Sequence, residues 1–231
     1  MAPSMTAQTA AANAVATIAA SESRSSGRGQ PGRLITGPVA AGLAVWAGLA
    51  ALLGQSGFFQ TEIGGIPVAI VAAIALPVFG FIIAWRAFAG VRAFVEAQDL
   101  ATLTAVQGWR VVGAVFVFLW AYGQLPAVFA LPAGLGDVAV GLIAPFAAIA
   151  VALKAPGWRR AAYGVVIAGL ADFAVAVVTG IGSIDGNFLN FAGAPPNSII
   201  NALPLVLIPG FLVPVFIIAH MMAIIKLRSA R

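Results

Sequence analysis

The chain carries very little charge. Of its 231 residues only 8% are Asp, Glu, Lys or Arg, while 61% are hydrophobic. A soluble domain has about 25% charged residues, so this chain has too few to cover a surface that faces water. Long apolar stretches with so few charges indicate that lipid surrounds most of the chain. This excludes an ordinary soluble enzyme or binding domain.

Cysteine is absent, and His220 is the single histidine. The chain therefore cannot form disulfides, thiolate metal sites, iron–sulfur clusters or a cysteine nucleophile. One histidine also excludes a haem held by two histidines of one chain and a multi-histidine zinc or copper site. We expect His220 to lie at the cytoplasmic membrane interface, and no predicted span offers it a serine in an elbow motif. The sequence thus predicts no cofactor and favours a protein that is not an enzyme.

The basic residues follow a pattern typical of membrane topology, whereas nucleic-acid binding gathers Lys and Arg with aromatic residues on one face. All 12 Lys and Arg residues, Arg110 included, fall at loops or span ends on one side, and the loops of the other side hold only Glu62 and Asp185 as charged residues. Cytoplasmic loops carry the excess of Lys and Arg, so we expect both termini to be cytoplasmic. A hydrocarbon core of about 30 Å takes roughly 20 helical residues. The predicted fold is an all-α, polytopic integral membrane bundle of six transmembrane helices, with spans at 37–57, 66–85, 110–131, 134–153, 161–180 and 202–225.

The first 33 residues differ from the rest of the chain. They are rich in Ala, Ser, Thr and Gly, and their arginines follow a weakly apolar run, whereas a secretory signal places its basic residues before the apolar core. We predict a disordered cytoplasmic tail at 1–33 and a transmembrane domain at 34–231. The expected location is the bacterial plasma (inner) membrane, with the lipid bilayer as a partner and no nucleic acid.

Two carboxylates lie within predicted spans. Asp172 is well inside 161–180, and Asp137 is just inside the outer end of 134–153. An ionisable residue in the membrane is costly and indicates a function by default. No Lys or Arg lies deep within a predicted span, so we expect Asp172 to lack a cationic partner and to be largely protonated at rest, or charged only when a cation or water reaches it. The structural alternatives are a hydrogen-bonded staple at Asp172 and a helix N-terminus stabilised by Asp137.

Small residues recur on the helix faces that carry the two aspartates. Residues four apart share a helix face, and small residues allow helices to approach closely in lipid. We therefore expect both carboxylates to point into helix interfaces and the two spans to pack through these stripes. The stripes are Gly164, Ala168, Asp172, Ala176 and Gly180 on one span, and Asp137, Gly141, Ala144 and Ala148 on the other.

One short motif resembles a known family. Gly134-Leu135-Gly136-Asp137 is similar to the Gly-x-Gly-Asp signature of intramembrane aspartyl proteases. The resemblance implies two facing carboxylates that share a proton and activate water, with Asp172 as the second. The sequence departs from the family at Ala171, where those proteases usually have Tyr before the other aspartate, and it lacks their Pro-Ala-Leu motif.

The last predicted span contains Pro204, Pro209 and Pro214. Each proline removes a backbone donor and crowds the preceding turn, which is tolerated in a membrane where protein or water satisfies the freed groups. The span is therefore either a kinked packing helix or a discontinuous helix that lines a cavity. The uncharged amides of the preceding loop, which ends near Asn201, suit a lid over such a cavity or an ordinary interfacial loop.

Three functions stay open at this point. The first is a carrier or binding protein for a small molecule or ion, with Asp172, Asp137 and Asn201 as the ligand- or ion-binding residues. The alternative is a non-catalytic accessory or assembly subunit that binds a membrane-complex partner or forms a homo-oligomer. The third is the intramembrane aspartyl protease that the short motif implies.

Overall fold

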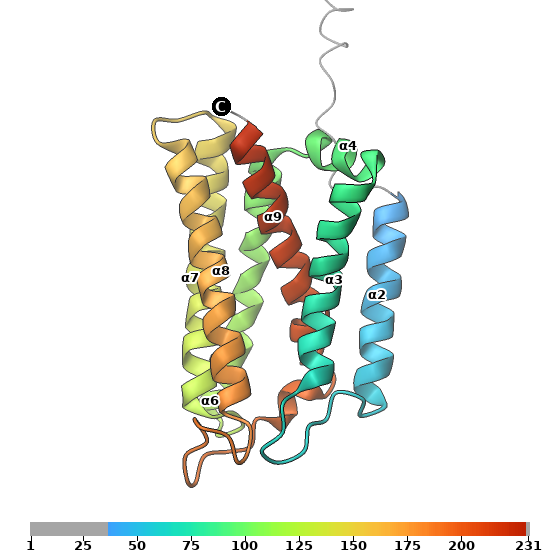
Figure 1. The fold of residues 1–231 in the computed structure, drawn as a ribbon. Coiled ribbons are helices and arrows are strands. Elements are labelled where there is room, and N and C mark those ends of the chain that lie inside the picture. Colours follow the sequence, from blue (N-terminus) through green and yellow to red (C-terminus); the bar gives the residue numbers. More distant parts are fainter. Residues whose placement is uncertain (1–36, 230–231) are drawn as a thin grey trace, which may run out of the picture. The chain divides into compact units, whose positions relative to one another are not determined.

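The computed structural model describes residues 37–229, all of whose regular elements are helical (Figure 1). Six helical segments are long and apolar enough to cross a membrane, which confirms the predicted all-α bundle of six spans. The predicted tail at 1–33 lies outside the described residues. The six segments are α2 (Gly37–Gln55), α3 (Val68–Ala87), the composite Leu100–Ala121, α7 (Ala127–Ala152), α8 (Trp158–Gly182) and the composite Ile208–Ser229.

Both composite segments change helix type along their length. Leu100–Ala121 consists of α5 (Leu100–Ala105), the 3-10 stretch η1 (Val106–Gly113) and α6 (Ala114–Ala121). Ile208–Ser229 begins with the π-helical turn η3 (Ile208–Leu212) and continues as α9 (Val213–Ser229). A short seventh helix, α4 (Ala89–Ala97), joins α3 to α5.

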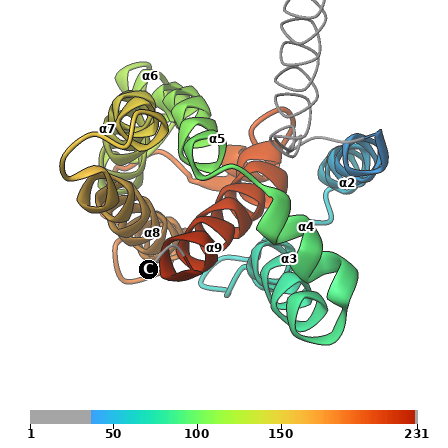
Figure 2. The ribbon, with the colours of Figure 1, turned by 90° about the horizontal axis from the view of Figure 1, so that it is seen from above.

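Helix α9 lies in the middle of the bundle when it is viewed along its axis (Figure 2). It contacts α5 and α8 on one side and α3 on the other. Helices α7 and α8 pack side by side, and α7 also packs along η1 and α6. Helix α2 is peripheral, and it packs on η3 through an edge-to-face contact of Trp46 with Phe211, whose ring centroids are 5.3 Å apart.

The third and fourth spans begin earlier than predicted. The third span was predicted at 110–131 and occupies Leu100–Ala121, and the fourth was predicted at 134–153 and begins at Ala127. Asp99 sets the start of α5, because its carboxylate accepts a hydrogen bond from the backbone N–H of Thr102 at 2.8 Å. This shift moves Arg110 from a predicted span end to the middle of the third span.

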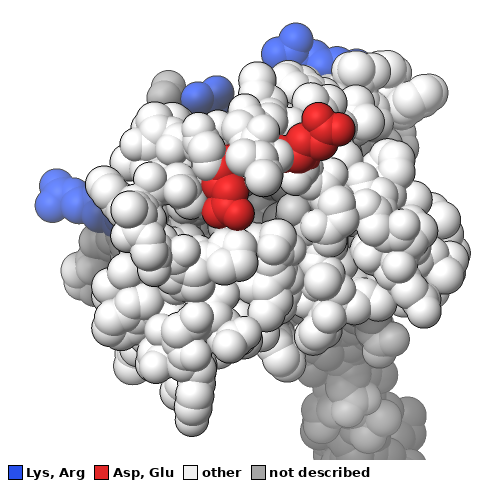
Figure 3. Space-filling view, turned by 90° about the horizontal axis from the view of Figure 1, so that it is seen from below, with Lys and Arg blue, Asp and Glu red and all other residues white. Residues whose placement is uncertain are grey.

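Charge separates the two ends of the bundle. Figure 3 shows one end, where two acidic side chains lie among uncharged ones and basic side chains appear only at the rim. We call this the acidic end, and its charged loop residues are Glu62 and Asp185. The opposite end is the basic end, where α3 and α9 finish and the loop between α7 and α8 turns. The basic residues placed there are Arg86, Arg92, Lys154, Arg159, Arg160, Lys226 and Arg228.

The small-residue stripes are partly confirmed. All four stripe residues of α7 are buried, and Gly141 packs against η1, where an added methyl group would come within 2.7 Å of the Val111 backbone nitrogen. On α8 the prediction is wrong for Gly164 and Ala168, which are exposed beside a groove between α7 and α8. A row of residues spaced by four rotates about 40° per step around a helix of 3.6 residues per turn, so a row of five cannot keep one face inward.

Candidate functional site

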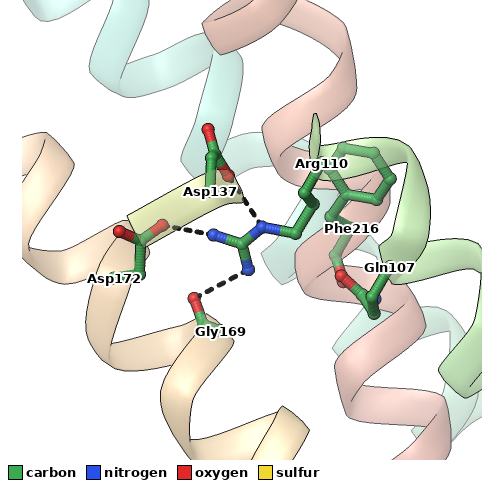
Figure 4. Close-up of polar contacts among 6 residues, drawn as sticks. All are labelled: Gln107, Arg110, Asp137, Gly169, Asp172 and Phe216. Carbon is green, nitrogen blue, oxygen red and sulfur yellow. Dashed lines mark hydrogen bonds and ion pairs between the residues drawn. The ribbon is translucent and has the colours of Figure 1, made fainter. Parts of the chain in front are cut away.

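Arg110 lies at the centre of the bundle and is completely buried. Its Nε donates to Asp137 Oδ1 at 2.7 Å, its Nη2 donates to Asp172 Oδ2, and its Nη1 donates to the Gly169 carbonyl oxygen at 3.1 Å (Figure 4). One guanidinium thus joins η1 to α7 and α8. We call Arg110, Asp137 and Asp172 the Arg110 cluster.

The structure brings the two predicted aspartates together through a residue that the sequence did not single out. The expectation that Asp172 lacks a cationic partner is wrong, because it forms an ion pair with Arg110. Asp137 lies well inside α7, so it does not cap a helix N-terminus. With both carboxylates ionised, the formal charges of the cluster sum to one net negative charge. Among residues 37–229, one oxygen of each carboxylate has no hydrogen-bond partner, which leaves acceptor capacity in the cluster.

Glycines provide the space in which the cluster fits. A methyl group added at Gly136 of α7 would overlap the Asp172 carboxylate, and one at Gly113 would overlap the Asp137 side chain. At Gly169 it would come within 2.6 Å of Arg110 Nη1. Close packing against Asp172 therefore explains why residue 136, just before Asp137, is a glycine. Both carboxylates bind the guanidinium, whereas the resemblance to intramembrane aspartyl proteases implies that they share a proton with each other.

Helix α9 contributes His220 and a backbone acceptor to the same region. His220 is 1% exposed and lies beside Gly169 and Arg110 in the middle of the last span, so the expectation that it lies at the membrane interface is wrong. Its ring packs edge-on to Phe173, with centroids 6.4 Å apart, and its buried Nε2 has no partner within the described part of the chain. Gln107, one helical turn before Arg110, donates from Nε2 to the Phe216 carbonyl oxygen at 3.3 Å. These contacts connect the central helix to the cluster.

A cavity of about 150 Å³ lies on the acidic-end side of the cluster. Phe173 separates the two features, because it lines the cavity and its ring also lies 3.8 Å from the Arg110 guanidinium carbon. The cavity is formed by α3, α6, α7, α8, η3, the first residue of α9 and the loops of the acidic end. Its other lining residues include Ile70, Ile74, Phe116, Phe129, Ala176, Gly180, Ile181, Asp185, Ser198 and Asn201.

The predicted site residue Asn201 lines this cavity, while the two aspartates lie beneath its floor. Other amides of the preceding loop hold the loop together. Asn197 donates from Nδ2 to the Gly180 carbonyl oxygen and to Ser183 Oγ, both at 2.8 Å, and Asn190 donates to Asp185 Oδ1 at 3.0 Å. Asn201 makes no side-chain hydrogen bond to residues 37–229, so its amide is available to a ligand.

The irregular first turn of the last span also borders the cavity. Helical structure was predicted from residue 202, but the regular span begins only at Ile208, and its first turn is π-helical. Ile208, Pro209 and Val213 line the cavity at this irregular turn. Irregular backbone within a membrane is tolerated where it lines a cavity or packs on protein, which matches this position.

Comparison with known proteins supports family membership alone. No curated protein and no solved structure matches the chain. A family described as "Domain of unknown function (DUF8737)" matches residues 67–228, which include α3 to α9, the Arg110 cluster and most of the cavity lining. The chain therefore belongs to the DUF8737 family.

Proposed function

We propose that the protein is a carrier or membrane-embedded binding protein for a small amphipathic molecule. The observation that carries this proposal is the cavity at the acidic end, whose floor, Phe173, covers the charged Arg110 cluster. Ligand sites are concave and mostly apolar, with a few polar groups that orient the ligand. Asn201 and Asp185 supply polar groups here, and apolar side chains, with isoleucine and phenylalanine the most frequent among them, supply most of the remaining wall.

The basic end is proposed to face the cytoplasm. Its loops and helix ends carry the Arg and Lys residues, and cytoplasmic loops show this excess in membrane proteins. The cavity then opens toward the outer side of what we take to be a bacterial plasma membrane. Val95, Leu103 and Leu227 pack near the cytoplasmic end and are nearly inaccessible, so that end is closed in this conformation.

The moving element is proposed to be the segment that leads from Asn201 through η3 into α9. Discontinuous helices at binding sites are common in transporters, where they supply free backbone groups and hinge points. This segment contacts the cavity through Pro209 and the cluster region through His220. Its movement would change the shape of the cavity and the packing around Arg110 together.

Ligand binding can be tested by filling the cavity. Ile181 lines the cavity, whereas Ile167 is 66% exposed on the lipid-facing side of the same helix. We would measure the thermal unfolding midpoint in lipid nanodiscs with a panel of amphipathic alcohols, amines and carboxylic acids that carry a benzene-sized group. A ligand present at 100 times its Kd stabilises the folded state by about 2.7 kcal/mol.

The wild-type protein and the control variant Ile167→Trp should be stabilised by the same members of the panel, and Ile181→Trp by none of them. The proposal fails if no member stabilises the wild-type protein more than Ile181→Trp. It also fails if both tryptophan variants lose the response equally.

A further inference from the structure

We infer that the cavity takes a small organic cation, an ammonium group attached to an apolar part about the size of a benzene ring. This inference rests on the proposed function, since it names the ligand class of the same cavity. Three independent properties of the cavity lead to it: its aromatic side chains, its surrounding charge and its volume.

The deep part of the cavity is lined by three phenylalanines from three helices. Phe116 and Phe129 pack edge to face with ring centroids 5.2 Å apart, and Phe173 forms the floor. Aromatic ring faces attract organic cations, and several rings around one site form a cage for an ammonium group. Phe173 already contacts one cation, the guanidinium of Arg110, at 3.8 Å.

The charge around the cavity favours a cation over an anion. Among residues 37–229, no Lys or Arg lines the cavity, and Asp185 is its only charged lining residue. Asp172 lies one helical turn below Ala176 on the same face of α8, and residues in this relation have Cβ atoms about 5–6 Å apart. With both carboxylates of the Arg110 cluster ionised, the formal charge below the floor is also negative. An ammonium group among the phenylalanines would offset this charge, whereas a carboxylate would be repelled from both directions.

The volume limits the size of the ligand. A dry apolar cavity of about 150 Å³ holds a benzene molecule, and the cavity has this volume. A group the size of a benzene ring therefore fits the cavity, and because the cavity is open toward the acidic end, the remaining atoms of a phenethyl frame can extend out of it. Asn201 and Ser198, which line the cavity, can accept hydrogen bonds from an ammonium group, and they can accept from or donate to an attached hydroxyl group.

Three probes that share one phenethyl frame separate charge from shape. 2-Phenylethylamine is a cation at neutral pH, 2-phenylethanol is neutral, and phenylacetate is an anion. Each would be titrated against the full chain in nanodiscs, with binding read from the concentration dependence of the unfolding midpoint. The response of Ile181→Trp would be subtracted to remove nonspecific effects of the probes on the lipid.

The amine should bind at least tenfold more tightly than the alcohol, and phenylacetate should not bind. Asp185→Asn keeps the oxygen that accepts the hydrogen bond from Asn190, so it should still fold, and it should weaken amine binding about threefold without changing alcohol binding. Alcohol or anion binding as tight as amine binding overturns the inference and leaves the proposed function standing. No binding of any of the three probes also overturns it, while the wider panel then decides the proposed function separately.

Discussion

Removal of Arg110 should destabilise the protein by about 3–5 kcal/mol, the usual cost of leaving buried charges without their partner. Arg110→Met keeps most of the aliphatic stem but removes three hydrogen bonds, two of them to carboxylates. Asp137 and Asp172 would then lie close together without a cation, with side chains only 12% and 9% exposed. The free energy of unfolding can be measured by circular dichroism in mixed micelles of mild detergent and increasing SDS.

The triple variant Arg110→Met, Asp137→Asn, Asp172→Asn tests the cause of this loss. It removes all three formal charges at once, so it should recover at least half of the stability that the single variant loses. Arg160→Met, at an exposed position of the basic end, serves as the control and should change stability by less than about 0.5 kcal/mol. A single variant as stable as the control would refute the buried-cluster argument, and so would a triple variant no more stable than the single one.

Three further outcomes follow from the structure. For topology, Gln60→Cys at the acidic end should react with an impermeant maleimide added outside intact cells and Ser229→Cys at the basic end should not; the reverse pattern would invert the proposed orientation. For packing, Gly136→Ala should destabilise the protein by about 1–3 kcal/mol, because its methyl group overlaps Asp172. Gly164→Ala has no atom within 4 Å of the added carbon, so it should be neutral or slightly stabilising in the same unfolding titration. For function, Asp172→Asn keeps shape but loses its charge, so a carrier should fold and insert normally yet lose uptake of its ligand into proteoliposomes; unchanged uptake would make Asp172 a structural residue.

The six spans were predictable because hydrophobic length is a local property of the sequence. Arg110, the central residue of the site, was not predictable, because the topology argument treats each arginine as a marker of a span end. Arg110 satisfied that count even though it lies in the middle of the third span. Asp99 followed by Thr102 was a local signal for the true start of the third span, since Asp is a favoured N-cap residue.

The contacts within the Arg110 cluster could not be predicted from the sequence. Arg110 is 27 residues from Asp137 and 62 from Asp172. No spacing rule joins positions on three separate helices, so the aspartates could be identified as unusual without their partner being found. The position of Asn201 at a cavity depends likewise on the fold of the loop and of η3, which the proline positions indicate only in part.

The location of Arg110 also affects how the chain enters the membrane. The third span is the least apolar of the six, and an arginine near the centre of a helix raises its insertion free energy by about 2.5–3.5 kcal/mol. Arg110 is synthesised 27 residues before Asp137 and 62 residues before Asp172, so its helix leaves the ribosome before both neutralising helices are complete. The cost of placing this arginine in the membrane is therefore offset only when α7 and α8 have packed against η1.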